Sequence, residues 1–193
     1  HAASRLAEAK DLYRQALELQ TALVRQDPQD PDLQSSLGGI YNNLGMNEEN
    51  VQRYDGAARS YQAAVEHQRE AYSYAPKVPR YRLFLSKHYY NYGRVLRQLG
   101  RPGEAVNAAL ERRALWPTDP EHLFAVAEEL ALATRLVTAA PQTDLPVEKC
   151  VAYTLETLRQ AQAAGWKPPA DGKWIASFSA LKDSPEFAGL RGN

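Results

Sequence analysis

Three histidines and one cysteine are the residues best suited to metal binding or nucleophilic chemistry. His67, His88 and His122 are far apart in the sequence, and no H-E-x-x-H motif sets two of them one helical turn apart. Cys150 follows Lys149, a neighbour that can lower the pKa of a thiol. A single cysteine, however, excludes an intrachain disulfide and a zinc site of several cysteines. We therefore expect core or surface histidines, with metal ligation as the alternative, and a packing role for Cys150.

Two pairs of adjacent carboxylates are candidates for general acid–base catalysis. The first is Glu48 with Glu49, and the second is Glu128 with Glu129. Neighbours one position apart on a helix do not face each other, so we expect both pairs to lie on solvated edges. The sequence also contains no G-x-S-x-G motif and no phosphate-binding P-loop. These observations predict that this segment is not an enzyme and carries no cofactor or metal.

A short basic strip is the strongest charge pattern in the chain. Lys87, Arg94 and Arg97 are spaced by seven and three, which puts them on one helical face and favours an acidic partner. The whole chain is balanced, with 23 Lys and Arg residues against 23 Asp and Glu residues. Nucleic-acid binders show a basic surplus, so we expect no nucleic-acid partner. The tyrosines around Tyr90, which could stack on bases, are expected to serve packing and groove lining instead.

The elements that must position these residues are marked by prolines. Three pairs recur along the chain, Pro28 with Pro31, Pro76 with Pro79 and Pro117 with Pro120. Proline fits the first turn of a helix and stops a helix that runs into it, so each pair predicts one helix ending and another beginning. A P-x-x-P ligand for an SH3-type groove is the alternative, which the long helical flanks disfavour.

Between these marks, apolar residues recur at intervals of three and four, as on an amphipathic helix. No stretch alternates with period two long enough to predict a strand. The pattern predicts an all-α chain of about seven helices, and the longest apolar run is far short of the ~18 residues that span a membrane. The predicted helices include Ala3–Gln26, Tyr81–Leu99, Glu104–Leu115, Glu121–Val137 and Val147–Ala164.

The chain repeats itself after 48 residues. The shift that moves Pro28 onto Pro76 superimposes Tyr13 on Tyr61, Tyr41 on Tyr89, Asn43 on Asn91 and Gly45 on Gly93. A glycine inside a helix costs ~1 kcal/mol relative to alanine, which predicts a neighbouring helix that needs the space. Ala57, Tyr61 and Ala64 share one face of the following helix, so we expect Tyr61 to fill the space beside a glycine.

These repeats resemble tetratricopeptide repeats (TPRs). The residues that match in the later repeat are Tyr89, Tyr92, Gly93, Gly100, Ala105 and Pro117, and those in the earlier one are Tyr41, Leu44, Gly45, Ala57, Tyr61 and Ala64. Ala109 and Arg112 depart from the aromatic and small residues of the pattern. Pro76 comes seven residues late, and Gln52 replaces the turn glycine. The long helices and the Asn-Asn-Leu-Gly string are similar to the extended repeats of kinesin light chains.

The resemblance implies a right-handed superhelical solenoid that forms a single TPR domain over residues 1–193. Its expected parts are the second helix of a truncated repeat (1–28), an extended repeat (31–76), a further repeat (79–117), a divergent repeat (120–165) and a C-terminal cap (166–193). Trp166 and Trp174 are expected to anchor the cap, and Trp116 to pack at a helix end.

The C-terminal third has a narrower resemblance to the TPR tail of planctomycete-type bacterial serine/threonine kinases. The resemblance lies in Leu-Phe-Ala-Val-Ala-Glu-Glu-Leu at 123–130, in Gly165-Trp166, and in the Pro-Glu-Phe-x-x-Leu string at 185–190. It implies a cytoplasmic recruitment region behind a kinase domain. The kinase motifs themselves are missing from this sequence, and His1 suggests a fragment of a longer chain.

The TPR resemblance also implies a concave groove lined by the first helix of each repeat. In peptide-binding TPRs, asparagines at the places of Asn43 and Asn91 hold the ligand backbone, because an amide both donates and accepts. The other expected groove residues are Asn42, Met46, Glu49, Lys87, Tyr90, Arg94 and Arg97. The alternative is that Asn42 and Asn43 only satisfy local backbone groups. The carboxylate clamp of chaperone-type TPRs is poorly matched, so a peptide C-terminus is not the expected ligand.

Two other functions are consistent with the sequence. The first helix lacks the partner helix of its repeat, so we expect Leu12, Leu19 and Leu23 to be covered, either in a homodimer through this helix or by upstream sequence. The segment could instead regulate an attached kinase by docking on it.

Overall fold

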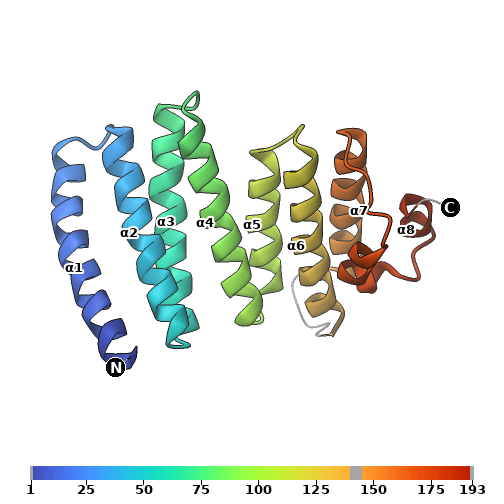
Figure 1. Ribbon diagram of the computed structural model, residues 1–193, viewed down its shortest axis with the longest axis horizontal. Helices are drawn as coiled ribbons and strands as arrows, with labels where there is room; N and C mark the ends of the chain where they lie inside the picture. Colours follow the sequence, from blue (N-terminus) through green and yellow to red (C-terminus); the bar gives the residue numbers. More distant parts are fainter. Residues whose placement is uncertain (1, 140–144, 192–193) are drawn as a thin grey trace. The chain divides into compact units, whose positions relative to one another are not determined.

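The computed structural model describes residues 2–139 and 145–191, with side chains described from Leu12 onward. Within these residues all regular structure is helical and no strand occurs, which confirms the all-α prediction. The elements are α1 (Ala2–Gln26), α2 (Pro31–Asn50), α3 (Tyr54–Tyr74), α4 (Pro79–Gln98), α5 (Pro102–Ala114), α6 (Pro120–Ala139), α7 (Val147–Ala163), the 3₁₀ segment η1 (Lys173–Leu181) and α8 (Pro185–Leu190) (Figure 1). None of the helices in the described residues is both long and apolar enough to cross a membrane.

The second proline of each pair opens a helix, as predicted. Pro31, Pro79 and Pro120 are the first residues of α2, α4 and α6. Proline has no N–H to lose there, and its φ is already helical. At α2 the preceding Asp30 caps the end, because its carboxylate accepts from the N–H of Asp32 at 2.7 Å and of Leu33 at 3.1 Å. The helices therefore begin one or two residues earlier than the apolar pattern alone predicted.

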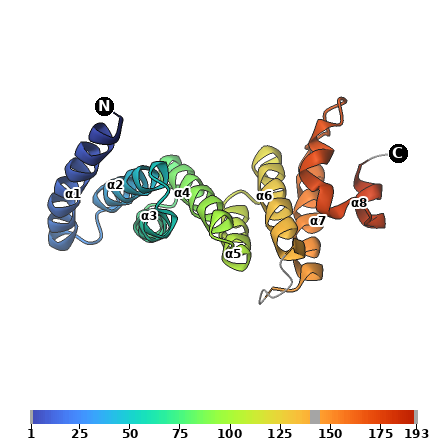
Figure 2. The ribbon, with the colours of Figure 1, turned by 90° about the horizontal axis from the view of Figure 1, so that it is seen from below.

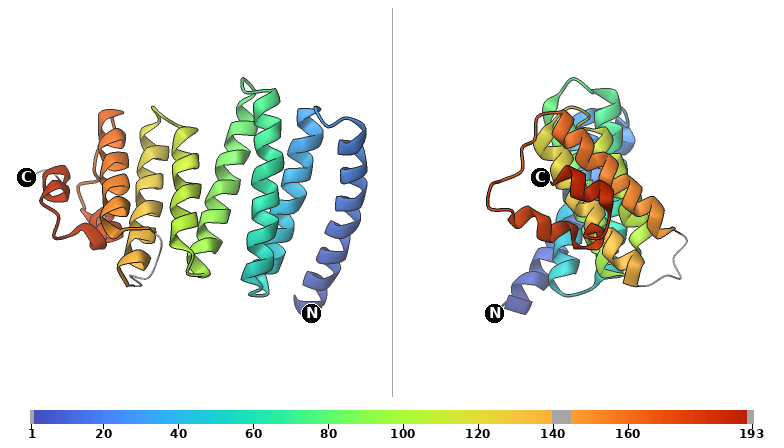
Figure 3. Two further views of the ribbon diagram at one scale, coloured as in Figure 1. Left: turned by 180° about the vertical axis from the view of Figure 1, so that it is seen from behind. Right: turned by 90° about the vertical axis from the view of Figure 1, so that its right-hand side faces the viewer.

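The chain divides into two compact units, residues 1–99 and residues 100–193. In the first unit, α1 to α4 pack in chain order, and α3 lies against both α2 and α4 (Figure 2). In the second unit, α5 packs on α6, α6 packs on α7, and η1 packs against α6. Consecutive helices within each unit run in opposite directions, which the view from behind also shows (Figure 3).

The centre of the first unit is the contact between α2 and α3. Tyr61 is fully buried, and a Cβ built on Gly45 would lie 2.7 Å from ring atoms Cδ1 and Cε1. Glycine at position 45 therefore leaves room for the Tyr61 ring, as the repeat pattern predicted. Ala57 and Ala64, one turn to either side of Tyr61, are also fully buried and let the two helices approach closely.

The turn between α2 and α3 has an unusual backbone. Gln52 has a φ of 59°, and it is the one non-glycine residue with positive φ among the residues described. This left-handed conformation is the one that the turn glycine of the repeat pattern would adopt without strain. The turn thus has the geometry expected of glycine although glutamine occupies this position.

The second unit has two apolar centres. In the first centre, Trp166 and Trp174 meet edge to face with their ring centroids 5.3 Å apart. Phe124 stacks on Trp166 with a distance of 4.0 Å between ring centroids. Phe178 and Phe187 complete this cluster, so the tryptophans anchor the C-terminal segment as predicted. In the second centre Cys150 is fully buried, and burial raises the pKa of its thiol. The burial of Cys150 confirms its packing role. The alternative, a lowered pKa of the thiol, is wrong.

The prediction of solvated edges at the carboxylate pairs is wrong. Glu129 is buried and forms an ion pair with Arg112 of α5, and Glu128 accepts from the hydroxyl of Ser177 at 2.8 Å. The Glu49 side chain is also largely buried, and it forms an ion pair with Arg94 of α4. Arg112 stands where the repeat pattern has a small residue, and the pair with Glu129 accounts for that departure.

Candidate functional site

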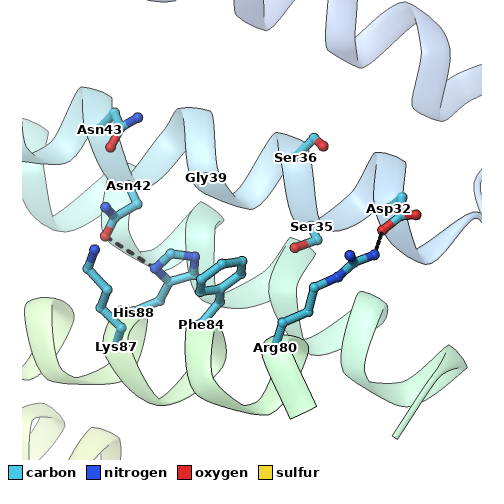
Figure 4. Close-up of a pocket in the computed structure, with 10 residues that line it drawn as sticks. All are labelled: Asp32, Ser35, Ser36, Gly39, Asn42, Asn43, Arg80, Phe84, Lys87 and His88. Atoms are coloured by element: carbon cyan, nitrogen blue, oxygen red, sulfur yellow. Dashed lines mark hydrogen bonds and ion pairs between the residues drawn. The ribbon is translucent and has the colours of Figure 1, made fainter. Parts of the chain in front are cut away.

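The main candidate site is a groove of about 680 Å³ between α2 and α4 of the first unit (Figure 4). Amide, hydroxyl, charged and aromatic side chains line it. The lining residues are Asp32, Ser35, Ser36, Gly39, Asn42 and Asn43 from α2, and Arg80, Phe84, Lys87 and His88 from α4.

The floor of the groove is a buried hydrogen-bonded cluster. The side-chain oxygen of Asn42 accepts from Nδ2 of Asn91 at 2.8 Å and lies 3.2 Å from Nδ1 of His88. The Asn42 amide nitrogen in turn contacts the sulfur of Met46 at 3.6 Å. All three polar members, Asn42, His88 and Asn91, are buried. Their mutual hydrogen bonds offset the cost of that burial and fix α4 against α2.

Burial controls the charge of the imidazole in this cluster. Loss of water, together with the neighbouring charge of Lys87, lowers the pKa of His88 from 6.5 to about 4. The ring is therefore neutral at pH 7, whereas Lys87 beside it is exposed and charged.

One end of the groove is closed by an ion pair. Asp32 pairs with Arg80 and accepts from the hydroxyl of Tyr81 at 2.5 Å. The Tyr81 hydrogen bond, followed by the charge of Arg80, lowers the pKa of Asp32. Both charges at this end are thereby satisfied within the protein.

The middle of the groove is open because its residues on α2 are small. A Cβ built on Gly39 would meet no atom within 4 Å. Ser36 is exposed, and the Ser35 hydroxyl is turned toward Gln68, to which it donates at 3.0 Å. The groove therefore has open space where α2 has almost no side-chain volume.

The structure brings together some of the predicted groove residues. Asn42, Asn43 and Lys87 line the groove. Asn91 and Met46 do not line it, but both contact the side chain of Asn42. Asn43 is exposed whereas Asn91 is buried, so the two residues that the repeat makes equivalent have different environments.

The other predicted groove residues lie outside the set that lines it. Arg94 forms an ion pair with Glu49, with Nη2 at 2.7 Å from Oε2, and the Tyr61 hydroxyl donates to the same carboxylate at 2.8 Å. Tyr90 is exposed and Arg97 is half-buried on α4. Because Glu49 neutralises Arg94, the basic strip contributes Lys87 to the groove but not the three charges that the spacing suggested.

Several groove residues, including His88 and Phe84, were not predicted from the sequence. Phe84, Lys87, His88 and Asn91 follow one another at spacings of three, one and three, which is one face of a helix. This spacing was the available signal. It was hidden because His88 was treated as an isolated histidine.

The other two histidines have packing roles, as expected. His67 lies 2.9 Å from the side-chain oxygen of Gln34 and stacks on Tyr41, and His122 stacks on Trp116. The latter contact also confirms Trp116 as a residue that packs at a helix end. The described residues contain no cluster of three or more side chains suited to hold a metal ion.

Comparison with known proteins adds no family: no protein-family model matches the chain, and a search of curated proteins finds no match.

Proposed function

We propose that this chain is a non-catalytic interaction module that binds an extended segment of a partner protein in the groove between α2 and α4. The observation that carries the proposal is the groove itself, about 680 Å³ in volume and lined by amides, hydroxyls, a cation and an aromatic ring. A peptide backbone presents both donors and acceptors, and an exposed amide such as Asn43 can pair with both. Lys87 adds a charge that favours an acidic segment.

The lining residues favour binding over catalysis. Acid–base or nucleophilic chemistry needs a base in contact with the group it activates. Among the ten lining residues, His88 contacts the amide of Asn42, and Asp32 is held by Arg80 and Tyr81 at the end of the groove. Neither group is arranged as part of a nucleophile–base pair.

The repeats are proposed to be TPRs in a right-handed superhelix. The packing of Tyr61 on Gly45, the helices that open at proline and the glycine-like turn at Gln52 support this proposal. The placement of the chain behind a cytoplasmic bacterial serine/threonine kinase, where it would recruit substrates, rests on the resemblance of the C-terminal third alone.

A variant that fills the groove tests the proposed function. Gly39→Gln adds a side chain to the groove lining at a position where a Cβ meets no atom within 4 Å, and replacement of a helical glycine should stabilise the fold by up to ~1 kcal/mol. Gly189→Gln in α8 is the matched control, because a Cβ there also meets no atom within 4 Å. An array of blocked synthetic nonapeptides, screened on the wild-type protein, supplies the ligands.

We expect Gly39→Gln to weaken peptide binding at least tenfold and Gly189→Gln to leave it unchanged. Equal binding by the wild type and Gly39→Gln would contradict the groove assignment.

Self-association is a second candidate, supported by one observation. Leu12, Leu19 and Leu23 of α1 are 58%, 72% and 44% exposed, and their spacing of seven and four puts them on one face. Sedimentation equilibrium tests this candidate by comparing the wild type with Leu19→Glu. A dimer that dissociates in the variant supports it, and a monomer at high concentration contradicts it.

A further inference from the structure

One polar atom at the floor of the groove has no partner. His88 is only 4% exposed, and its Nε2 makes no hydrogen bond with any residue that the structure describes. A buried polar atom without a partner destabilises the folded state, so in a native protein it calls for an explanation. The position of His88 in the lining of the groove suggests one (Figure 4).

The hydrogen bonds around Asn42 determine what this nitrogen can do. Asn91 donates its amide N–H to the side-chain oxygen of Asn42, so that oxygen is an acceptor. The Nδ1 atom of His88, 3.2 Å from the same oxygen, must therefore carry the proton. In a neutral imidazole the other nitrogen then has a lone pair, so Nε2 can only accept.

We propose that Nε2 of His88 is a specificity element of the groove, which accepts a hydrogen bond from an uncharged donor of the bound peptide. The donor is a backbone N–H or a side-chain hydroxyl. A cationic donor is disfavoured because Lys87, the neighbour of His88, lines the same groove. This inference deepens the proposed function and rests on it.

Nε2 is buried, so a side chain of the groove lining must move before a ligand reaches it. Phe84 precedes His88 by one helical turn and lines the same groove (Figure 4). Phe84 is 41% exposed, and exposed side chains change rotamer in picoseconds to nanoseconds. We infer that rotation of this ring toward solvent opens Nε2 to the ligand.

Two conservative variants separate recognition by His88 from its structural role. The amide of asparagine ends at the δ position, so His88→Asn can keep the donor to Asn42 but removes the ε acceptor. The amide of glutamine ends at the ε position, so His88→Gln keeps an ε acceptor but loses the δ donor. If the proposal is correct, the two variants rank in opposite orders for stability and for binding.

The experiment measures dissociation constants, by fluorescence anisotropy, for the nonapeptides that the wild type selects from the array. Urea unfolding of each variant gives the stability. We expect His88→Asn to bind about tenfold more weakly with the smaller loss of stability, and His88→Gln to bind within about threefold of the wild type with the larger loss. Binding that follows stability instead, weakest in His88→Gln, would overturn the proposal, as would unchanged binding in His88→Asn.

The Gly39→Gln variant separates failure of this inference from failure of the proposed function. If Gly39→Gln abolishes binding while both His88 variants bind like the wild type, the groove is correct and His88 is not a specificity element. If Gly39→Gln binds like the wild type, the groove itself is wrong, and the inference fails with it.

Modified ligands identify the donor. Single N-methylation along a selected peptide removes one backbone N–H at a time, and replacement of serine or threonine by alanine or valine removes the hydroxyls. The modification that weakens wild-type binding but has no further effect on His88→Asn marks the donor. If every modification that weakens wild-type binding weakens His88→Asn binding equally, no donor depends on Nε2, and the proposal is overturned.

Discussion

The ring of Tyr61 lies so close to Gly45 that a methyl group on the glycine would come within 2.7 Å of two ring carbons. This contact joins α3 to α2 at the buried centre of the first unit. The same tyrosine donates its hydroxyl to Glu49, and Glu49 pairs with Arg94 of α4. One aromatic side chain thus takes part in both the apolar and the polar packing of three helices.

Gly45→Ala should destabilise the protein although alanine is the better helix former. The gain in helix propensity is up to ~1 kcal/mol, whereas overpacking against a fully buried ring costs about 1–3 kcal/mol. Gly39→Ala in the same helix is the control, because its Cβ has open space and the variant should be more stable than the wild type. Urea unfolding measures both changes. A similar gain in both variants would show that α2 and α3 are not in tight contact at Gly45.

Stability should fall when the pH drops from about 6.5 to about 4. The pKa of His88 is lowered to about 4 in the folded state, so across this interval the unfolded chain binds more protons than the folded one. The loss is at most about 3 kcal/mol, from 1.36 kcal/mol per pKa unit. His88→Gln should remove this part of the pH dependence but keep the part from His67, whose pKa is also lowered. Parallel stability curves for the wild type and His88→Gln would contradict the burial of this imidazole.

Removal of Arg112 alone should lower the free energy of unfolding more than replacement of both Arg112 and Glu129 by apolar residues. Both side chains are largely buried, at 13% and 5% exposure. Arg112→Met alone leaves a buried carboxylate without its counter-charge, for which we expect a loss of about 3–5 kcal/mol. The double variant with Glu129→Leu should recover part of that loss, because neither charge then remains buried. Additive effects in denaturant titrations would mean that the two residues do not interact.

Gln52→Gly should stabilise the turn between α2 and α3. Gln52 has a φ of 59°, and left-handed backbone costs about 1–2 kcal/mol for a residue with a Cβ. Part of this gain is offset because glycine makes the unfolded chain more flexible, so we expect about 1 kcal/mol. As a control, Gln62→Gly at an exposed position of α3 should lose about 1 kcal/mol. If thermal denaturation shows both variants destabilised, the turn does not have this conformation.

Asn43→Ala and Asn91→Ala should have different effects although the repeat makes the two positions equivalent. Asn43 is exposed in the groove, so its loss should weaken peptide binding and change the free energy of unfolding by less than ~0.5 kcal/mol. Asn91 is buried and donates to Asn42, so its loss should cost about 1–3 kcal/mol. Anisotropy and urea unfolding test the pair. Equal stability losses would show that the environments of the two residues are the same.

The helices and their starts could be predicted from the sequence because the signals are local. Proline in a first turn and a glycine inside a helix each have one main physical explanation, and both are found at Pro79 and Gly45. The contact of Gly45 with Tyr61 followed from the same reasoning, because three small or aromatic residues on one face leave little choice of packing.

The groove could be predicted only in part. The contact between Asn42 and His88 depends on the rotation of α2 relative to α4, and α3 lies between them in the sequence. The burial of Glu129 likewise depends on Arg112, which comes 17 residues earlier on another helix. Neither contact has a local signal, so the sequence predicts a solvated edge at Glu129 and a core or surface histidine at His88.

The contacts of the Glu49 carboxylate have a further consequence for how the helices of the first unit unfold. The carboxylate belongs to α2, takes its hydrogen bond from Tyr61 of α3 and its counter-charge from Arg94 of α4. If any one of these helices frays at this level, the carboxylate loses a donor or a cation in a place with little water. We therefore expect the three helices to unfold together, so that a ligand bound in the proposed groove between α2 and α4 would also protect α3, which it does not need to touch.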